Sequence, residues 1–382
     1  MKIDTRPLYR IALAALFTTT ALSGAFANVP EMATERLKAI IEQQGAVIEW
    51  ERADIDGDDV VLVNVEVGNT EGRLPIGDIT LTGVSRVDQG YRVEEITFDD
   101  MEFGDDMGAV TMDGAELTGV LLPDDANLDN YGGTLFYETA YVGNISVSIE
   151  NEEIVSMSDF YTELSAPADG RPMTYTGRAE EFYLDLSIVD DPNQRAVLEA
   201  LDYLELTGSF AFEGYWQPDG GRFALSQYDI TIDDAGTLGI TADIDGYTPE
   251  FIASLRDLQL QMAANPDADS SAQGLAILGL MQQLTFHSAE ISFSDDSLTN
   301  KVLEFVAAAQ GMRPADIANQ AKAILPFALG QLGNPELTMQ ATQAVSAFLD
   351  NPQSIRLRAA PASPAASWPR TSPLSISGMT PS

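Results

Sequence analysis

The chain has 382 residues, of which 45% are hydrophobic, and its 59 acidic and 20 basic side chains give a formal charge of −39. A surface this acidic repels nucleic-acid phosphates and anionic lipid headgroups, which excludes nucleic acid as a partner and a polybasic membrane anchor. The chain has no cysteine, which excludes disulfides and the lipid-modified cysteine of a bacterial lipoprotein.

Residues 1–27 have the features of a secretory signal peptide. Three basic residues within the first ten precede an apolar run, Ile11–Leu22, and small residues at Ala25 and Ala27 suit signal peptidase. We expect cleavage before Asn28 and a periplasmic location. Cleavage removes three basic residues and one acidic residue, so the mature chain would carry a charge of −41. No later apolar run reaches the roughly 18 to 20 residues that span a bilayer, so we expect no transmembrane anchor after cleavage.

Residues 28–246 are expected to form an N-terminal helix followed by an antiparallel sheet. Pro30 suits a first helical turn, and Ala33, Leu37 and Ile40 follow at helical spacing until Gly45. The period then changes to two: valines at 61, 63, 65 and 67 alternate with polar residues, and later segments repeat this pattern. Such alternation is typical of an antiparallel sheet with one packed and one wetted face. Short Gly- and Asp-rich turns favour a meander.

Two features interrupt this strand pattern. Asp191 and Pro192 are suited to cap and open a helix whose apolar stripe includes Val197, Leu198 and Leu201. Leu-Thr-Gly recurs at irregular spacing, which predicts similar hairpins and leaves a diverged internal duplication as an alternative. The three copies are Leu81–Gly83, Leu117–Gly119 and Leu206–Gly208.

Residues 247–359 are expected to be rich in helix and to pack on the sheet. Pro249, Pro314 and Pro335 each suit a first helical position. Apolar stripes follow them, including one at Leu298, Val302, Phe305, Val306 and Ala309. We expect strands at about Thr285–Phe293 and Ser354–Leu357, and Pro326 should kink or end its helix.

Residues 360–382 are rich in proline and serine and hold no acidic residue, which predicts a disordered tail. The composition changes abruptly, so a shifted reading frame near Pro364 is the alternative explanation. Either way we expect the tail to be dispensable for folding.

The acidic segment Asp54-Ile55-Asp56-Gly57-Asp58-Asp59 does not match a calcium loop. Its glycine is fourth rather than sixth, and Val65 stands where the bidentate Glu belongs. We interpret the segment as an acidic hairpin turn. No metal-binding residue and no cofactor-binding residue is predicted.

His287 is the only histidine, and it shares strand parity with Ala289, Ile291 and Phe293. We therefore expect its side chain to point into the core with a backbone partner. A second group, Glu213 and Asp229 near Trp216, Tyr215 and Tyr228, could in principle cleave a glycan, since that chemistry needs two carboxylates about 5 to 10 Å apart. Cross-strand packing is the interpretation we favour for these aromatic residues, so no catalytic residue is predicted.

The chain resembles uncharacterised exported proteins of Gram-negative bacteria. The resemblance rests on the signal peptide, the acidic strand-rich body and the segments Ser294–Leu298 and Phe348–Pro352. The short sequence motifs of the strands, such as Leu-Thr-Gly, also resemble those of AsmA-like envelope proteins. The resemblance implies a compartment and an architecture, and it assigns no catalytic residue.

The sequence therefore predicts an α+β fold, with a large curved antiparallel sheet, helices on one side of it and a helix-rich C-terminal part. The leading functional hypothesis is a non-enzymatic periplasmic protein that binds an apolar ligand such as a lipid, or an envelope protein, along the sheet. The alternatives are a carboxylate-based glycan hydrolase and a structural or assembly factor of the envelope. A continuous apolar lining favours the binder, whereas two acids facing inward beside Trp216 favour the hydrolase.

Overall fold

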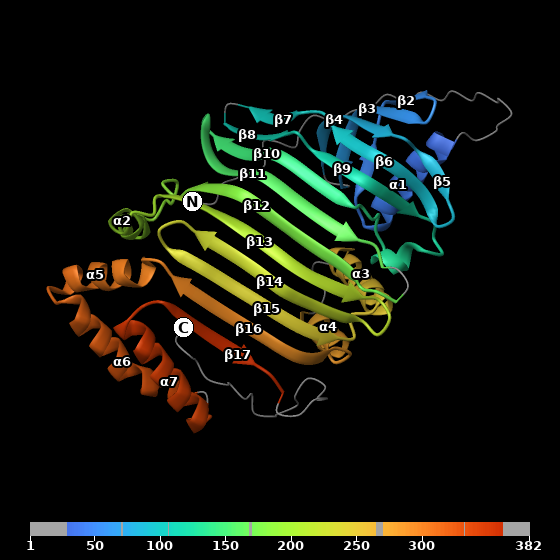
Figure 1. The fold of residues 1–382 in the computed structure, drawn as a ribbon. Coiled ribbons are helices and arrows are strands. Elements are labelled where there is room, and N and C mark those ends of the chain that lie inside the picture. Colours follow the sequence, from blue (N-terminus) through green and yellow to red (C-terminus); the bar gives the residue numbers. More distant parts are fainter. Residues whose placement is uncertain are drawn as a thin grey trace.

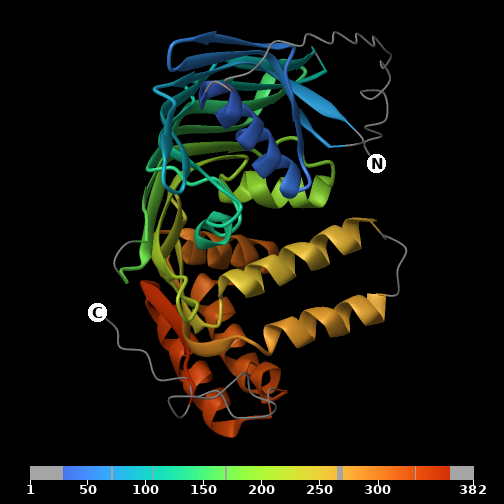
Figure 2. The same ribbon diagram turned by 90° about the vertical axis from the view of Figure 1, so that its right-hand side faces the viewer.

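The computed structural model describes residues 29–361, apart from residues 70–71, 106, 168–169, 265–269 and 332. These residues form one antiparallel sheet of 17 strands, and the helices lie on one side of it (Figures 1 and 2). Seen from its edge in Figure 2, the sheet curves toward the helices. The predicted α+β architecture is confirmed. The predicted signal peptide and residues 362–382 of the predicted tail lie outside the described residues.

Helix α1 (Val29–Gln43) covers the N-terminal end of the sheet. Its predicted stripe is confirmed, because Ala33, Leu37 and Ile40 are buried. The helix ends before Gly45, whose φ of +83° suits glycine and turns the chain into the first strand.

The N-terminal strands are short and pair in the order β2–β3–β4–β6–β9, while β1 also pairs with β3, β5 with β6, and β7 with β8. Beneath α1 they bury valines and leucines completely, among them Val60, Leu62 and Val93. The strands are β1 (Val47–Glu49), β2 (Arg52–Asp56), β3 (Asp59–Gly68), β4 (Arg73–Thr82), β5 (Ser85–Val87), β6 (Gly90–Phe98), β7 (Met101–Asp105), β8 (Gly108–Asp113) and β9 (Glu116–Pro123).

Eight further strands, most of them longer than the N-terminal ones, continue the sheet as a meander, each antiparallel to the next. The first of them pairs with both β9 and β8, which joins the two parts of the sheet. These strands are β10 (Thr139–Ile149), β11 (Glu152–Ser165), β12 (Met173–Asp185), β13 (Glu205–Gln217), β14 (Arg222–Ile232), β15 (Gly236–Asp245), β16 (Thr285–Asp295) and β17 (Ser354–Ala359). A 3₁₀ turn, η2 (Leu128–Tyr131), precedes β10.

Four of the remaining helices begin at a proline that the sequence predicts to open a helix. Asp191 caps α2 (Pro192–Leu201) by accepting hydrogen bonds from the backbone N–H groups of Asn193 and Gln194. The prolines at 249, 314 and 335 open three helices. The C-terminal helices are α3 (Pro249–Ala264), α4 (Ser270–Met281), α5 (Leu298–Gln310), α6 (Pro314–Gly330) and α7 (Pro335–Asp350). Helix α6 continues through Pro326 instead of ending there.

The predicted burial of the α5 stripe is wrong in part. Val302 remains 38% exposed, and the one fully buried residue of α5 is Ala307, which the stripe did not include. The closest backbone neighbours of α5 are α2 and α6. The helix therefore shares its apolar surface with other helices and leaves part of it in contact with water.

The Leu-Thr-Gly segments are not three similar hairpins. Leu81–Gly83 lies at the end of β4, where Gly83 has a φ of +67°. Leu117–Gly119 and Leu206–Gly208 lie within β9 and β13. The Leu-Thr-Gly motif thus occurs in one turn and in two strand interiors, so it does not predict a single local structure.

Candidate functional site

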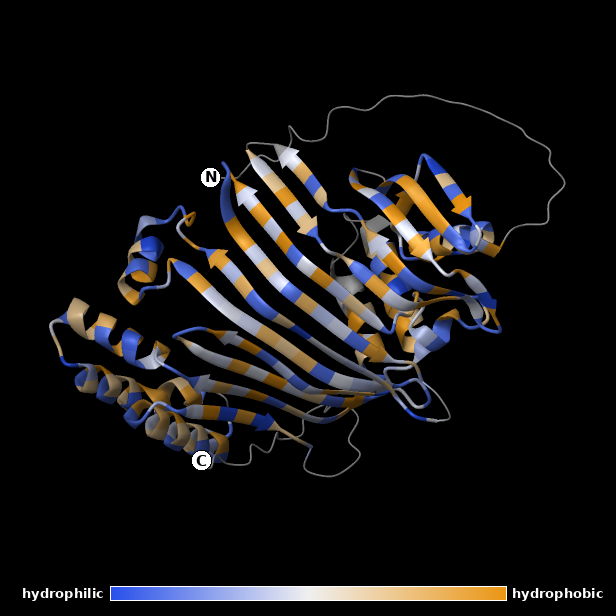
Figure 3. Cartoon of the chain, turned by 45° about the horizontal axis from the view of Figure 1, so that its top comes forward, coloured by the Kyte–Doolittle hydropathy of each residue, from blue (hydrophilic) through white to orange (hydrophobic). Residues whose placement is uncertain are grey.

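The two faces of the long strands differ sharply in polarity. Side chains alternate along a strand, and directly paired residues on neighbouring strands share a face. On β13, Leu206, Phe210, Phe212 and Trp216 occupy one face, while polar residues such as Thr207 and Glu213 occupy the other. Figure 3 shows the resulting alternation of hydrophobic and hydrophilic residues along the strands. We call the face that carries Phe210 the inner face and the opposite one the outer face.

The inner face is the side that meets the helices. Trp216 on β13 donates a hydrogen bond from Nε1 to the carbonyl oxygen of Tyr247 at 2.7 Å. The rings of Phe223, Tyr247 and Phe251 follow one another with centroids 5.5 and 5.4 Å apart, which links β14 to helix α3. Phe251 is almost fully buried. These contacts dock α3 onto one end of the inner face.

An unbroken apolar row crosses the inner face from β10 to β17. Direct register partners form it, one from each strand. Neighbouring strands lie about 4.8 Å apart, so eight strands make a row about 34 Å long. Its members are Val142, Phe160, Ala179, Phe210, Ile230, Leu238, Phe293 and Ile355.

The adjacent outer row on the same strands is polar by comparison. It contains no aliphatic side chain larger than alanine, although it crosses the same eight strands. Its members are Tyr141, Tyr161, Arg178, Ala211, Asp229, Gly239, Ser292 and Arg356. Only the inner face can therefore offer a continuous apolar lining.

Much of the inner face remains open. Under α1 the inward side chains are fully buried, as at Leu62 and Val93. Farther along the sheet, Leu238 is 38% exposed, Ile291 49% and Leu357 50%. The inner face is thus covered by α1 at one end, by α3 near Phe251 and by α7 where Phe348 packs against Phe293, with ring centroids 6.4 Å apart, and it keeps exposed apolar side chains on β15–β17.

Aromatic rings form a second continuous feature of this face. The centroids of Phe160 and Phe210 are 5.9 Å apart, those of Phe210 and Phe212 are 6.4 Å apart, and Tyr175 lies 6.3 Å from Phe212 and 5.9 Å from Phe223. The hydroxyl of Tyr175 donates to the carbonyl oxygen of Ala224 at 3.1 Å. Burial raises the pKa of Tyr175, so this hydroxyl stays protonated and uncharged. The rings add apolar area without adding charge.

The residues considered for glycan cleavage are not brought together. Glu213 pairs with Gln227 and Asp229 with Ala211, which places both carboxylates on the outer face. Trp216 lies on the inner face, and its indole is already hydrogen-bonded to Tyr247. The two acids therefore have no aromatic platform from Trp216, whose register partners are Met173 and Phe223.

His287 does not point into the core, and the sequence-based expectation is wrong here. Asp243 pairs with Ser288, but Ile244 pairs with Phe286, so His287 is the extra residue of a β-bulge. The bulge breaks strand parity and puts His287 on the outer face. Its Nε2 lies 2.6 Å from the Oδ2 of Asp245, so its partner is a carboxylate rather than the backbone.

Arg222 completes an ionic cluster beside His287. It donates to Asp243 at 2.6 Å, and its guanidinium lies 3.6 Å from Asp245. Burial acts to lower the pKa of Arg222, but the hydrogen bond and the charge of Asp243 outweigh it and raise the pKa. The Nε of Arg222 and Oδ1 of Asp243 are buried without a hydrogen-bond partner. The cluster ties β14, β15 and β16 together.

The acidic segment at residues 54–59 is the predicted hairpin turn. Asp56 pairs with Asp59 across the turn from β2 to β3, and Gly57 has a φ of +65°. Among the described residues, no group of three or more histidine, aspartate or glutamate side chains is arranged to hold a metal ion.

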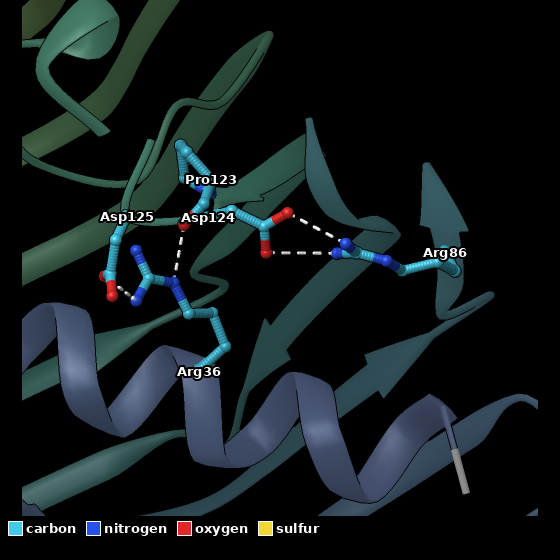
Figure 4. A network of polar contacts seen from close by, with 5 residues as sticks. All are labelled: Arg36, Arg86, Pro123, Asp124 and Asp125. Carbon is cyan, nitrogen blue, oxygen red and sulfur yellow. Dashed lines mark hydrogen bonds and ion pairs between the residues drawn. The ribbon is translucent and has the colours of Figure 1, made fainter. Parts of the chain in front are cut away.

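A polar network fixes α1 on the sheet (Figure 4). Arg36 of α1 donates to the carbonyl oxygen of Pro123 and to Asp125, both at 2.5 Å. Arg86 donates two hydrogen bonds to Asp124, at 2.8 and 3.1 Å. The hydrogen bond from Arg86 lowers the pKa of Asp124 below its ordinary value of 3.8. The network connects α1 and β5 to the end of β9, and its role is structural.

Comparisons with known proteins add a partial match. A family model described as "Uncharacterized protein" matches residues 229–369, which begin within β14 and extend past β17. A search of the curated proteins found no match to this chain. No helix among the described residues combines the length and the apolar character needed to cross a membrane.

Proposed function

We propose that this chain is a non-enzymatic periplasmic protein that binds an apolar ligand of the lipid class along the inner face of β10–β17. The observation that carries the proposal is the apolar row from Val142 to Ile355. The row is continuous over eight strands, and the neighbouring inner-face side chains of Ile291 and Leu357 are half exposed. The export signal predicted for residues 1–27 supports the location.

The free energy of apolar hydration explains why such a face would be occupied. Covering apolar surface gains about 25 cal/mol per Å², and large exposed apolar patches on proteins commonly mark binding sites. A bilayer core about 30 Å thick holds two acyl layers, so one acyl chain extends about 15 Å. A row about 34 Å long can therefore accommodate acyl chains lying across the strands.

The position of the acids supports a binder over the hydrolase. Glu213 and Asp229 face outward, away from the surface that would hold a substrate beside Trp216. The inner row contains no ionisable side chain. An envelope protein could use the same face, but the helices that already pack on it, α1, α3 and α7, favour a small ligand over a protein surface.

Binding can be tested with a fluorescent long-chain fatty acid and two neighbouring substitutions. Ile291→Gln changes an inner-face residue that is half exposed, whereas Glu290→Gln changes the adjacent outer-face residue. Losing the burial of an isoleucine against ligand costs about 1.5 to 3 kcal/mol, so Ile291→Gln should weaken binding at least about tenfold.

Glu290→Gln is the matched control, and it should leave the fatty-acid affinity within about twofold of the original. Equal affinities for both variants and the unchanged chain would contradict binding on the inner face. Absence of fatty-acid binding by the unchanged, delipidated chain would refute the proposal.

A further inference from the structure

Strands β2 and β17 each have one side without a partner strand in the described part of the chain. Strand β2 pairs with β3 on one side, and β17 pairs with β16 on one side. The other side of each strand presents backbone N–H and C=O groups that no strand of residues 29–361 covers. A free edge of this kind is a template for pairing with another chain.

The two edges carry opposite charge on the same face of the sheet. On β17, Leu357 pairs with Ile291 of the inner face, so Arg356 and Arg358 lie on the outer face. On β2, Ile55 pairs with the buried Val60, so Asp54 and Asp56 also lie on the outer face. All four charged residues are exposed.

The two edges also match in spacing. Each edge has two like charges two residues apart on the outer face, with an exposed apolar residue between them on the inner face: Leu357 on β17 and Ile55 on β2. Arg52 pairs with Asp54 at 3.0 Å, but Asp56 keeps the end of the β2 edge acidic, and Asp58 follows it in the turn.

We propose that β17 of one copy pairs with β2 of a second copy, so that successive copies join their sheets head to tail. With the inner faces aligned, either strand direction places arginines beside aspartates and Leu357 beside Ile55, because strand parity agrees at both edges. Pairing of different edges is heterologous, so it extends a chain of copies rather than closing a dimer. The inference stands independently of whether the inner face binds a ligand.

Pairing of like edges is disfavoured by the same charges. Two β17 edges would bring arginines together, and two β2 edges would bring aspartates together, both of which are destabilising. Charged edge residues also protect sheets from association in many proteins. That alternative explanation predicts a monomer at every concentration.

Sedimentation velocity over a concentration series tests the pairing with two charge-reversed variants of the mature chain. The unchanged chain should form dimers and longer species as its concentration rises. Arg356→Asp with Arg358→Asp makes both edges acidic, and Asp54→Arg with Asp56→Arg makes both edges basic. Each variant alone should raise the apparent dissociation constant at least about tenfold, and an equimolar mixture of the two should associate again.

Three outcomes of this experiment would overturn the proposal. They are a monomeric unchanged chain at all concentrations, association that the reversals leave unaltered, and a mixture that remains monomeric.

Single cysteines give a second readout with milder substitutions, because the chain has no cysteine of its own. A mixture of Ile55→Cys and Leu357→Cys chains should give dimers with a short bifunctional thiol cross-linker, and neither variant alone should do so. Val197→Cys on α2, which is also exposed, is the matched control and should not cross-link to Leu357→Cys. Cross-linking of either variant with itself, or none in the mixture, would overturn head-to-tail pairing.

Discussion

Replacing Phe251 with alanine tests how the helices α3 and α4 are held on the inner face. The side chain of Phe251 is only 1% exposed, its ring lies 5.4 Å from that of Tyr247, and it shares a buried cluster with Leu280 and Leu284. Leu280 and Leu284 come from α4 and the turn after it, so one ring joins both helices to the sheet.

The expected loss in the free energy of unfolding follows from removing an aromatic ring from a fully enclosed site. Phe→Ala substitutions in such sites lower the free energy of unfolding by about 3 to 5 kcal/mol. Phe327→Ala on α6 is the matched control, because Phe327 is 81% exposed and should cost less than about 0.5 kcal/mol.

Equilibrium unfolding in urea, followed by circular dichroism, measures both free energies of unfolding. A loss below about 1 kcal/mol for Phe251→Ala would refute the docking of α3 and α4 described above. Equal losses for the two variants would refute the reasoning from burial.

Three further outcomes are expected. The lowered pKa of Asp124 means that its hydrogen bonds from Arg86 stabilise the fold above pH 3.8 and lose that effect as the pH falls through the pKa of the folded state. Asp124→Asn should therefore make the free energy of unfolding fall less steeply on the acid side of its pH dependence, and an unchanged acid side would contradict the assignment. Thermal unfolding should respond to CaCl₂ in the same way before and after Asp56→Ala, and a saturable effect that this change abolishes would reveal a calcium site in the β2–β3 turn. N-terminal sequencing of the exported protein should begin at Asn28, and recovery of the uncleaved chain would contradict the signal peptide.

The parts of the fold that follow local rules could be predicted from the sequence. Asp191 caps α2, Pro335 opens α7, and the alternation in β13 gives its two faces correctly. Each depends on interactions within a few residues or on a regular period. Such rules act before tertiary contacts form, which is why they can be read from residue type and spacing.

Features set by long-range pairing could not be predicted in this way. The bulge at His287 arises from the register between β15 and β16. A single inserted residue reverses the face of the sheet that simple alternation assigns to the residues beyond it. Helix α4 is apolar on all sides, so it has no periodic stripe that would mark it as a helix.

The candidate site also combines features that follow local sequence rules with features that depend on long-range packing. The apolar members of the inner face, such as Phe210 and Leu238, are visible in the strand alternation. Their accessibility depends on where α1, α3 and α7 lie over the sheet, which no local sequence pattern predicts. The opposite charges of the β2 and β17 edges become meaningful only when the register shows that Asp54 and Arg356 share the outer face.

Native mass spectrometry of the protein purified from the periplasm tests the central claim most directly. Lipid binding on the inner face predicts a population heavier than the mature chain by the mass of a lipid. Organic extraction should remove this population, and Ile291→Gln should reduce it while Glu290→Gln should not. A single population at the mass of the unliganded chain in all three proteins would contradict an apolar ligand on the inner face.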